Sequence, residues 1–285
     1  MAPIKDLESL RQLIEEVGWA DRVDQLLSFV KPSIAISTHR VGEQSLALGT
    51  SKIGGAPDLP YDIAWPEYRG NALDFVAQIN LSDIREYDVE HLYPSTGIVY
   101  FFYDKRGLRQ GWAKENEPYQ TIYYNGDPKL LRRFEPPLTV GQKYTVCALT
   151  YEQELTFPPF ESYEVGKLLG LSYENIGEPD YDKYWKIAEG FRRPGEKHRI
   201  GGYPDPQQAD VFREAEYMVR HIPYGKLDYE QYGSEIQKWQ LLMQIDSDGK
   251  AGMTWFDVGT LYFCIKRDAL QKRQFDSVPV VMQCG

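Results

Sequence analysis

The chain has 285 residues, of which 42% are hydrophobic and 14% aromatic, enough apolar material for one large or two small globular domains. Its formal net charge of -10 argues against a nucleic-acid or anionic-membrane surface, because such surfaces need clustered Lys and Arg. The sequence has no run of eighteen apolar residues and no apolar leader. We therefore expect a cytoplasmic protein that does not cross a membrane.

The first thirty residues carry a helical pattern. Apolar residues recur at three- and four-residue steps from Leu7 to Val30, with a break near Gly18, which predicts one or two amphipathic helices covering the adjoining core. From Ser33 onward, short apolar or alternating runs predict strands. These runs are SIAIS, SLALGT, TGIVYFFYD, TIYYN and YTVCALTYEQELTF.

Helical patterns return after Phe160 and are followed by further strand patterns. The helical runs are SYEVGKLLGLSYENI, DYDKYWKIAEGFRR and ADVFREAEYMVRHI, and the strand runs are WQLLMQID, GTLYFCIK and VPVVMQC. Because strands and helices are segregated rather than alternating, the order predicts a mainly β or α+β fold with antiparallel sheets. We divide the chain into an N-terminal helical segment (1–32), a first β-rich half (33–157), a helical connector (158–198) and a second β-rich half (199–285). We expect the halves to pack as one globular unit.

Three landmarks occur twice in the same order. KIGGAPD at 52–58 is followed by Gln-Ile-Asn at 78–80 and Gly-Ile-Val-Tyr-Phe-Phe at 97–102. RIGGYPD at 199–205 is followed by Gln-Ile-Asp at 244–246 and Gly-Thr-Leu-Tyr-Phe-Cys at 259–264. This ordered recurrence predicts an internal duplication, and therefore two related halves.

The repeated Gly-Gly-x-Pro-Asp stretch predicts a rigid corner. Glycine enters the region of positive φ without a steric cost, and proline directs the residue before it into extended chain. A functional alternative is that backbone N–H groups of the glycines approach an anion, with Lys52 or Arg199 adding positive charge. Neither a P-loop nor a dinucleotide-binding pattern is present, so the structural interpretation leads.

The same motifs carry a family resemblance. GGAPDLPYDIAWP, LDFVAQINLSDI, YPSTGIVYFFYD, HRIGGYPDPQQ, LLMQIDSD, WFDVGTLYFCI and FDSVPVVMQC together resemble the YwqG-like family of bacterial proteins, a domain of unknown function. The resemblance runs from about Lys52 to Cys284 and implies a β-rich fold of two related halves, with no established reaction. The sequence departs from the family in a longer helical middle and in Asp257, which follows Phe256 where a Gly-Asp pair is expected.

No metal site, cofactor or catalytic set is indicated. DSDGKAGMTWFD at 246–257 begins like a calcium loop, but Lys250 and Ala251 stand where a ligand and the required glycine belong, so a polar turn is the leading interpretation. The three cysteines, Cys147, Cys264 and Cys284, are widely spaced and read as buried thiols of a reducing compartment. A thiol–imidazole pair between Cys284 or Cys264 and His198 is a weaker alternative.

The remaining possibility is a binding surface that the two halves form together. Amphipathic aromatics near loops, with carboxylates and amides close by, line grooves that hold a protein segment or a sugar, although ordinary half-buried packing explains them equally well. The aromatics are Trp65, Trp112, Trp255, Tyr119, Tyr123 and Tyr124. The candidate binding residues are Gly54, Gly55, Asp58, Trp65, Gln78, Asn80, Gly201, Gly202, Asp205, Gln244, Asp246, Trp255 and Asp257.

Three classes of function follow. The first is a non-enzymatic cytoplasmic binding protein with a basic protein partner, such as an immunity-type inhibitor of a basic toxin, which the acidic charge favours through electrostatic steering. The second is a small-ligand or carbohydrate-binding protein that uses the aromatics. The third is a hydrolase with an unrecognised carboxylate site. The oligomeric state is not indicated.

Overall fold

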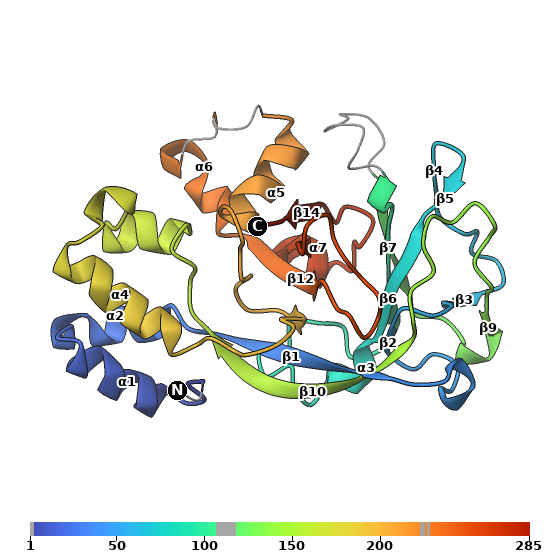
Figure 1. Ribbon diagram of the computed structural model, residues 1–285, viewed down its shortest axis with the longest axis horizontal. Helices are drawn as coiled ribbons and strands as arrows, with labels where there is room; N and C mark the ends of the chain where they lie inside the picture. Colours follow the sequence, from blue (N-terminus) through green and yellow to red (C-terminus); the bar gives the residue numbers. More distant parts are fainter. Residues whose placement is uncertain (1–2, 107–117, 223–225, 227–228) are drawn as a thin grey trace.

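The protein is built around one large antiparallel sheet. The computed structural model describes residues 3–106, 118–222, 226 and 229–285. The sheet has ten strands in the order β14-β13-β12-β11-β1-β10-β2-β6-β7-β8 and curls into a nearly closed barrel (Figure 1). Its strands are β1 (Lys31–Arg40), β2 (Lys52–Ile53), β6 (Asp74–Asn80), β7 (Ile98–Tyr103), β8 (Tyr119–Tyr124), β10 (Cys147–Thr156), β11 (Arg199–Ile200), β12 (Trp239–Asp246), β13 (Thr260–Lys266) and β14 (Val280–Gln283). The predicted mainly β, antiparallel class is confirmed.

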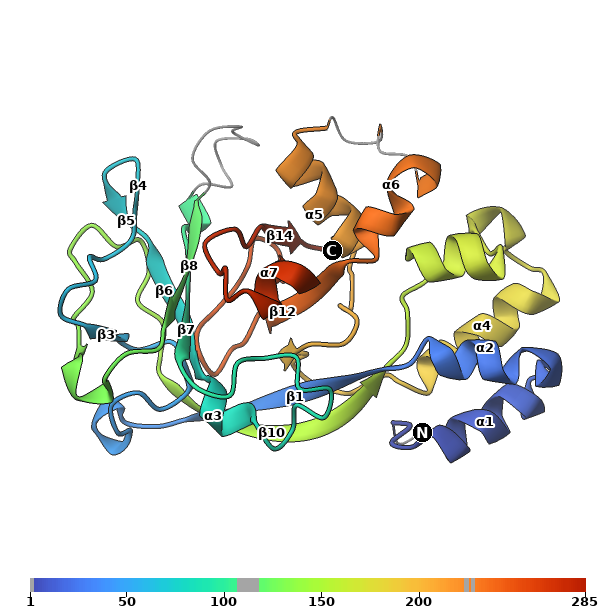
Figure 2. The same cartoon turned by 180° about the vertical axis from the view of Figure 1, so that it is seen from behind.

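Two small sheets and several helices surround the barrel. The small sheets pair β3 (Asp58–Pro60) with β9 (Leu131–Arg133) and β4 (Glu67–Tyr68) with β5 (Asn71–Ala72). The helices are α1 (Leu7–Glu16), α2 (Val23–Ser28), α3 (Leu81–Ile84), α4 (Pro179–Glu189), α5 (Val211–Arg220), α6 (Tyr229–Ile236) and α7 (Arg267–Gln271). Short helical turns are η1 (Ala20–Arg22), η2 (Glu43–Ser45), η4 (Pro128–Leu130), η5 (Glu164–Leu169) and η6 (Tyr173–Asn175). Figures 1 and 2 show α1, α2 and α4 gathered at one end of the molecule.

The local sequence explains where the first helices begin and end. Asp6 caps α1 by accepting a hydrogen bond from the backbone N–H of Ser9, and the chain leaves the helix at Gly18, whose φ is +87°. The predicted break near Gly18 is therefore confirmed. The predicted strand SLALGT is wrong: Ser45 ends η2, and residues 46–50 form a turn segment in which Leu48 is 50% exposed and has no sheet partner among the described strands.

The long strands β1 and β10 pair along their whole length, from Lys31 opposite Thr156 to Arg40 opposite Cys147. On their outer sides, β1 pairs with β11 and β10 pairs with β2. The strand order is therefore the same on both sides of this central pair: a corner strand (β2 or β11), a Gln-Ile-Asn/Asp strand (β6 or β12), a Tyr-Phe strand (β7 or β13) and an edge strand (β8 or β14). Each Gln-Ile-Asn/Asp strand pairs with the Tyr-Phe strand that follows it in the chain.

Alternate side chains of the barrel strands face different cores. Along β7 and β13, one alternating set of side chains faces a core shared by both halves. Phe101 and Phe263 belong to this set, and the centroids of their rings lie 4.8 Å apart. Their neighbours Tyr100 and Tyr262 face outward into separate clusters, one under β3 and β9 and one under α5 and α6. A fourth cluster joins α1, α2, η5 and α4. The period of two along each strand thus places the shared core inside the barrel.

All four glycines of the two corners have positive φ, between +68° and +74°. All four therefore lie in the left-handed region, which glycine enters without a steric cost, as the rigid corner predicted from the sequence requires. The corners also pack tightly: a Cβ on Gly54 would lie 2.4 Å from the carbonyl oxygen of Thr145, and one on Gly202 would lie 2.6 Å from the Thr156 hydroxyl.

We expect Gly54→Ala to lower the free energy of unfolding more than Gly18→Ala does. Both positions have positive φ, but an added Cβ at Gly18 meets no atom within 4 Å. Gly18→Ala should cost about 1 kcal/mol from backbone strain, and Gly54→Ala should exceed it by about 1–3 kcal/mol because of the clash. Equilibrium denaturation in urea measures both values, and equal losses would contradict the importance of the close packing.

Candidate functional site

The two Gly-Gly corners share one hydrogen-bond scheme. Gln78 accepts a hydrogen bond from the backbone N–H of Asp58 at 2.8 Å, and Gln244 accepts one from Asp205 at 3.0 Å. The amide nitrogen of each glutamine donates at 2.8 Å to a backbone carbonyl that precedes its corner, that of Thr50 or Lys197. Both glutamines are buried. Each side chain therefore fastens the two ends of its corner together.

Two further contacts recur in both halves. The hydroxyl of Tyr100 donates to the carbonyl of Asp58 at 2.6 Å, and that of Tyr262 donates to the carbonyl of Asp205 at 2.7 Å. The residue that ends the Gln-Ile-Asn/Asp strand also donates its N–H to a corner side chain, from Asn80 to Ser51 and from Asp246 to His198. In addition, the side chains of Asn80 and Asp246 each bond to backbone near the corner, the first to the carbonyl of Gly49 and the second to the N–H of Lys197.

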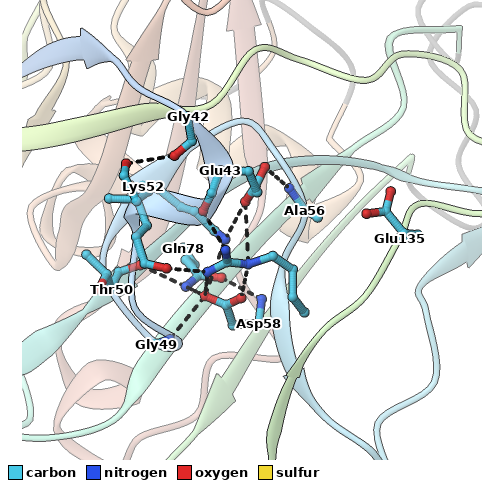
Figure 3. Close-up of polar contacts among 12 residues, drawn as sticks. Gly42, Glu43, Gly49, Thr50, Lys52, Ala56, Asp58, Gln78 and Glu135 are labelled. Carbon is cyan, nitrogen blue, oxygen red and sulfur yellow. Dashed lines mark hydrogen bonds and ion pairs between the residues drawn. The ribbon is translucent and has the colours of Figure 1, made fainter.

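The first corner encloses a network of charged side chains (Figure 3). Lys52 and Asp58 are fully buried, and Lys52 Nζ lies 3.3 Å from Asp58 Oδ2 and 3.0 Å from Glu43 Oε1. Arg133 Nε lies 2.8 Å from Asp58 Oδ1 and 3.6 Å from Glu43 Oε1. Burial alone would raise the pKa of Asp58, but the Arg133 hydrogen bond and the Lys52 charge outweigh it and hold that pKa below its ordinary value. The four charges balance one another.

The second corner has the same backbone with different charges. Arg199 pairs with Glu154 of β10 at 3.0 Å, and Asp205 pairs with Lys197 at the surface, where each side chain is more than a third exposed. The N–H of Tyr203 donates to the hydroxyl of Thr156 at 2.9 Å. In this corner, most of the interactions involve strand β10 rather than a loop.

His198 is fully occupied by structural contacts. Its Nδ1 accepts the Asp246 N–H at 3.1 Å, so its Nε2 carries the hydrogen and donates to Asp248 Oδ2 at 3.2 Å. Thr38 of β1 also donates to Asp248, at 2.6 Å. The imidazole therefore has no nitrogen left to activate a thiol. Cys147 and Cys264 are buried as predicted, whereas Cys284 is only half-buried.

The remaining predicted binding residues are dispersed. Trp65 is half-buried and donates its indole N–H to the carbonyl of Leu73 at 3.0 Å. Trp255 is fully buried against Tyr103 and Tyr144, and the adjacent Asp257 is exposed. Trp112 lies outside the described residues. The structure thus brings together Gly54, Gly55, Asp58, Gln78 and Asn80 at one corner and Gly201, Gly202, Asp205, Gln244 and Asp246 at the other. Their role in binding stays a prediction.

Charged residues that the sequence analysis did not identify complete a second buried cluster. Lys31 Nζ lies 4.0 Å from the centre of the Tyr203 ring, and the Tyr203 hydroxyl lies 3.2 Å from Glu164. Asp210 caps α5 and accepts the Tyr229 hydroxyl at 2.9 Å. Burial raises the pKa of Asp210 to about 7, with the Glu164 charge adding to the rise and the Tyr229 hydrogen bond opposing it. Only the tertiary fold joins these groups, so spacing in the sequence carries no signal of the cluster.

The described residues line a small enclosed hollow and an open depression, and no predicted binding residue lines either of them. One beside Lys31, Glu164 and Asp210 encloses about 10 Å³, the size of a single water site. The other is an open depression of about 470 Å³ between Tyr87 and Tyr151. Within the described ranges, no three His, Cys, Asp or Glu side chains are grouped to hold a metal ion. The helices of this same part of the chain are all too short or too polar to cross a membrane.

These features define a β-rich protein with a nearly closed antiparallel barrel and two buried, hydrogen-bonded corners. The chain belongs to the family described as domain of unknown function (DUF1963), whose model matches residues 51–284. The match begins next to the first corner and covers both corners and every barrel strand except β1. A search of curated proteins finds no match to this chain.

We expect Asp58→Asn to destabilise the protein by about 3–5 kcal/mol, because it leaves Lys52 buried with one carboxylate fewer. Glu135→Gln is the matched control, since Glu135 is 81% exposed in its pair with Lys143 and should cost less than about 1 kcal/mol. Denaturant unfolding at pH 7 measures both changes. A loss at Asp58 no larger than that at Glu135 would contradict the importance of the buried network.

We expect Asp210→Asn to remove a pH dependence of stability. Asp210 ionises near 3.8 in the unfolded chain but keeps its proton up to about pH 7 in the folded protein. Between these values the folded state binds more protons, so this group makes stability fall as pH rises. Asparagine still caps α5, so the advantage of Asp210→Asn over the wild type should grow between pH 5 and pH 8. If the free energies of unfolding of Asp210→Asn and the wild type differ by the same amount at pH 5 and pH 8, the assignment is refuted.

Proposed function

We propose that the protein works by binding a partner protein with a basic face, and that it does so through its helical layer. The helical layer comprises residues 3–30 and 161–190, which include α1, α2, η5, η6 and α4. The observation that carries the proposal is the concentration of negative charge in this layer. It holds thirteen Asp and Glu against six Lys and Arg, while the whole chain holds 42 against 32. Most of the net charge therefore lies in about a fifth of the residues.

The helical layer has its own core and an exposed apolar component. Leu10, Ile14, Tyr184 and Ile187 belong to a hydrophobic cluster separate from the barrel core. Large hydrophobic side chains remain exposed on its surface: Leu7 at 50%, Leu168 at 45%, Tyr173 at 56% and Ile176 at 62%. Exposed apolar groups among carboxylates suit a protein interface, where apolar contact supplies affinity and charge supplies steering.

A specific form of this function is an immunity-type inhibitor that neutralises a basic toxin in the bacterial cytoplasm. The negative charge of the layer supports it, because oppositely charged surfaces speed association and disfavour acidic competitors. The resemblance to YwqG-like proteins is compatible with this form. A toxin gene beside the gene for this chain would favour it over other binding roles.

We also propose that the barrel arose by internal duplication. The equivalent strands on the two sides of the β1–β10 pair support it, as do four hydrogen bonds that recur at both corners. They are the bond accepted and the bond donated by the Gln78 or Gln244 side chain, the bond donated by the Tyr100 or Tyr262 hydroxyl, and the bond accepted by Ser51 or His198. In this proposal each repeat begins with a long strand, β1 or β10. The two long strands are then exchanged, since each lies beside the corner strand of the other repeat.

Binding of a small ligand is a second candidate function. The first corner favours it, because Lys52, Arg133 and the N–H of Ala56 all approach one carboxylate, that of Glu43.

We expect affinity capture from the native cell to recover a basic protein, with recovery that falls as added salt screens the attraction. Replacing Glu15, Glu16, Asp21 and Glu189 by their amides should reduce recovery at low salt by about tenfold or more. All four are exposed and none makes a described ion pair. The matched control replaces four exposed carboxylates outside the layer by amides: Asp62, Glu67, Glu90 and Asp276. Recovery of no basic protein, or equal losses in both variants, would contradict the proposed surface.

A further inference from the structure

We propose that the first Gly-Gly corner is a carboxylate-binding site that is occupied in the resting protein by the side chain of Glu43. A free carboxylate, on a small acid or at the C-terminus of a peptide, is the ligand that takes its place when Glu43 moves away. The site lies at the opposite end of β1 from the helical layer, so this inference does not rest on the proposed basic partner.

The contacts of Glu43 are those of a bound ligand. Its Oε1 lies 3.0 Å from Lys52 Nζ and 3.6 Å from Arg133 Nε, and its Oε2 accepts the backbone N–H of Ala56 at 3.2 Å. The left-handed conformations of Gly54 and Gly55 turn the chain so that this N–H faces the carboxylate, and they allow close approach. A Cβ on Gly55 would lie 2.3 Å from Glu43 Oε2. Figure 3 shows the Glu43 carboxylate directed at Ala56, while Glu135 lies apart.

The charges of the site require an anion at this position. Lys52 is fully buried, and Asp58 offsets only one of the two positive charges that Lys52 and Arg133 bring. With Glu43 in place the four charges sum to zero, and without it the site carries one uncompensated positive charge. An unpaired buried charge is costly, so the emptied site favours a replacement anion. A monoanionic carboxylate restores the balance, whereas a phosphate dianion exceeds it.

Glu43 lies on a surface turn and not on a strand of the barrel. It belongs to the three-residue turn η2, and most of the chain from Val41 to Thr50 is exposed or half-buried. Between Gly42 and Leu48 the backbone is anchored through Arg133, which donates to the carbonyls of Glu43 at 2.6 Å and Leu46 at 3.0 Å, while Gly49 and Thr50 are held by Asn80 and Gln78. The Glu43 side chain itself is 23% exposed, which leaves a path for solvent anions.

The second corner shows that the fold does not require a carboxylate at this position. There the corresponding N–H, that of Tyr203, is satisfied by the neutral hydroxyl of Thr156, and the corner arginine is paired with Glu154. Both partners belong to β10, a central strand of the sheet. The acceptor at the second corner is therefore fixed in the barrel, while the acceptor at the first corner is a carboxylate on a surface loop. This difference distinguishes an exchangeable anion from a structural one.

The test is chemical rescue of Glu43→Ala. We expect this variant to unfold at a lower temperature than the wild type in sodium chloride. Sodium acetate at the same ionic strength should raise the midpoint temperature of unfolding of Glu43→Ala. The expected rise is about 2–4 °C when the acetate concentration is tenfold above its dissociation constant. In the wild type the Glu43 carboxylate competes with acetate for the site. Acetate should therefore raise the midpoint of the wild type only at concentrations about tenfold higher or more. Sodium phosphate should be less effective than acetate, and an equal or larger phosphate effect would overturn the assignment to a carboxylate.

Two variants control for general effects of charge. Glu43→Gln removes the charge but leaves the site filled, so acetate should not rescue it. Glu135→Ala removes a nearby exposed carboxylate outside the site and should show no response specific to acetate. Equal acetate responses in these variants and in Glu43→Ala would overturn the proposal. The absence of any acetate response in Glu43→Ala would also overturn it.

A direct measurement on the wild-type chain keeps the proposal testable if Glu43→Ala fails to fold. In an NMR titration with acetate, the backbone amide of Ala56 should shift as the free anion displaces Glu43, and the amide of Tyr203 at the second corner should not. Chloride at equal ionic strength is the control. No acetate-specific shift at Ala56, or shifts of equal size at the two corners, would refute the exchangeable site.

Discussion

The antiparallel pairing of β1 with β10 is the constraint on which the rest of the structure depends. Each of these strands has one further neighbour, and that neighbour is the corner strand that follows the other one in the chain: β11 lies beside β1, and β2 lies beside β10. The second half, residues 199–285, therefore continues the sheet only by pairing its strand β11 with β1 of the first half. The shared core adds to this dependence, because Phe101 and Phe263 meet inside the barrel from opposite halves. We infer that the barrel folds cooperatively as one unit, since separating the halves would expose both the sheet edges and the apolar core.

Both corners are buried turns whose backbone groups are hydrogen-bonded by side chains. In a turn that is buried inside a protein, some backbone N–H and C=O groups have no neighbouring strand to pair with. Each of these groups that stays without a hydrogen bond lowers the stability of the fold. Here a glutamine amide accepts from one side of the turn and donates to the other, and a tyrosine hydroxyl satisfies a further carbonyl. Because these partners are neutral, the scheme works with any charges around it. The two corners can therefore keep one backbone geometry while Asp58 is buried in an ionic network and Asp205 lies near the surface.

The parts of the fold that the sequence predicts are those set by local chemistry. The period of apolar residues identifies the strands and the first helices, and the Gly-Gly-x-Pro pattern identifies the positive φ angles. The wrong strand at SLALGT shows the limit of this reasoning, because Leu46 and Leu48 have a strand-like spacing but no neighbouring strand to pair with. The partners of the corner charges were not predictable for a related reason. Arg133 lies opposite Asp58 in the small β3–β9 sheet, 75 residues further along the chain, and Glu43 of η2 joins the network through Lys52 and Arg133, so only the tertiary fold brings these charges together. Likewise, Trp255 is buried because the fold places it between Tyr103 and Tyr144, which its own segment does not reveal.

The two proposed surfaces lie at opposite ends of β1, and their separation determines whether they influence each other. The first part of the helical layer ends at residue 30, just before Lys31, and Glu43 follows closely after Arg40, so the ten-residue strand β1 lies between them (Figure 1). A strand of this length spans about 30 Å, which is about three Debye lengths at 0.1 M salt. The negative charge of the layer is therefore largely screened at the corner, and it does not prevent a carboxylate from binding there. Local balance among Lys52, Arg133 and Asp58 decides that affinity instead. Electrostatically, a basic protein at one end and a carboxylate at the other can therefore be bound independently.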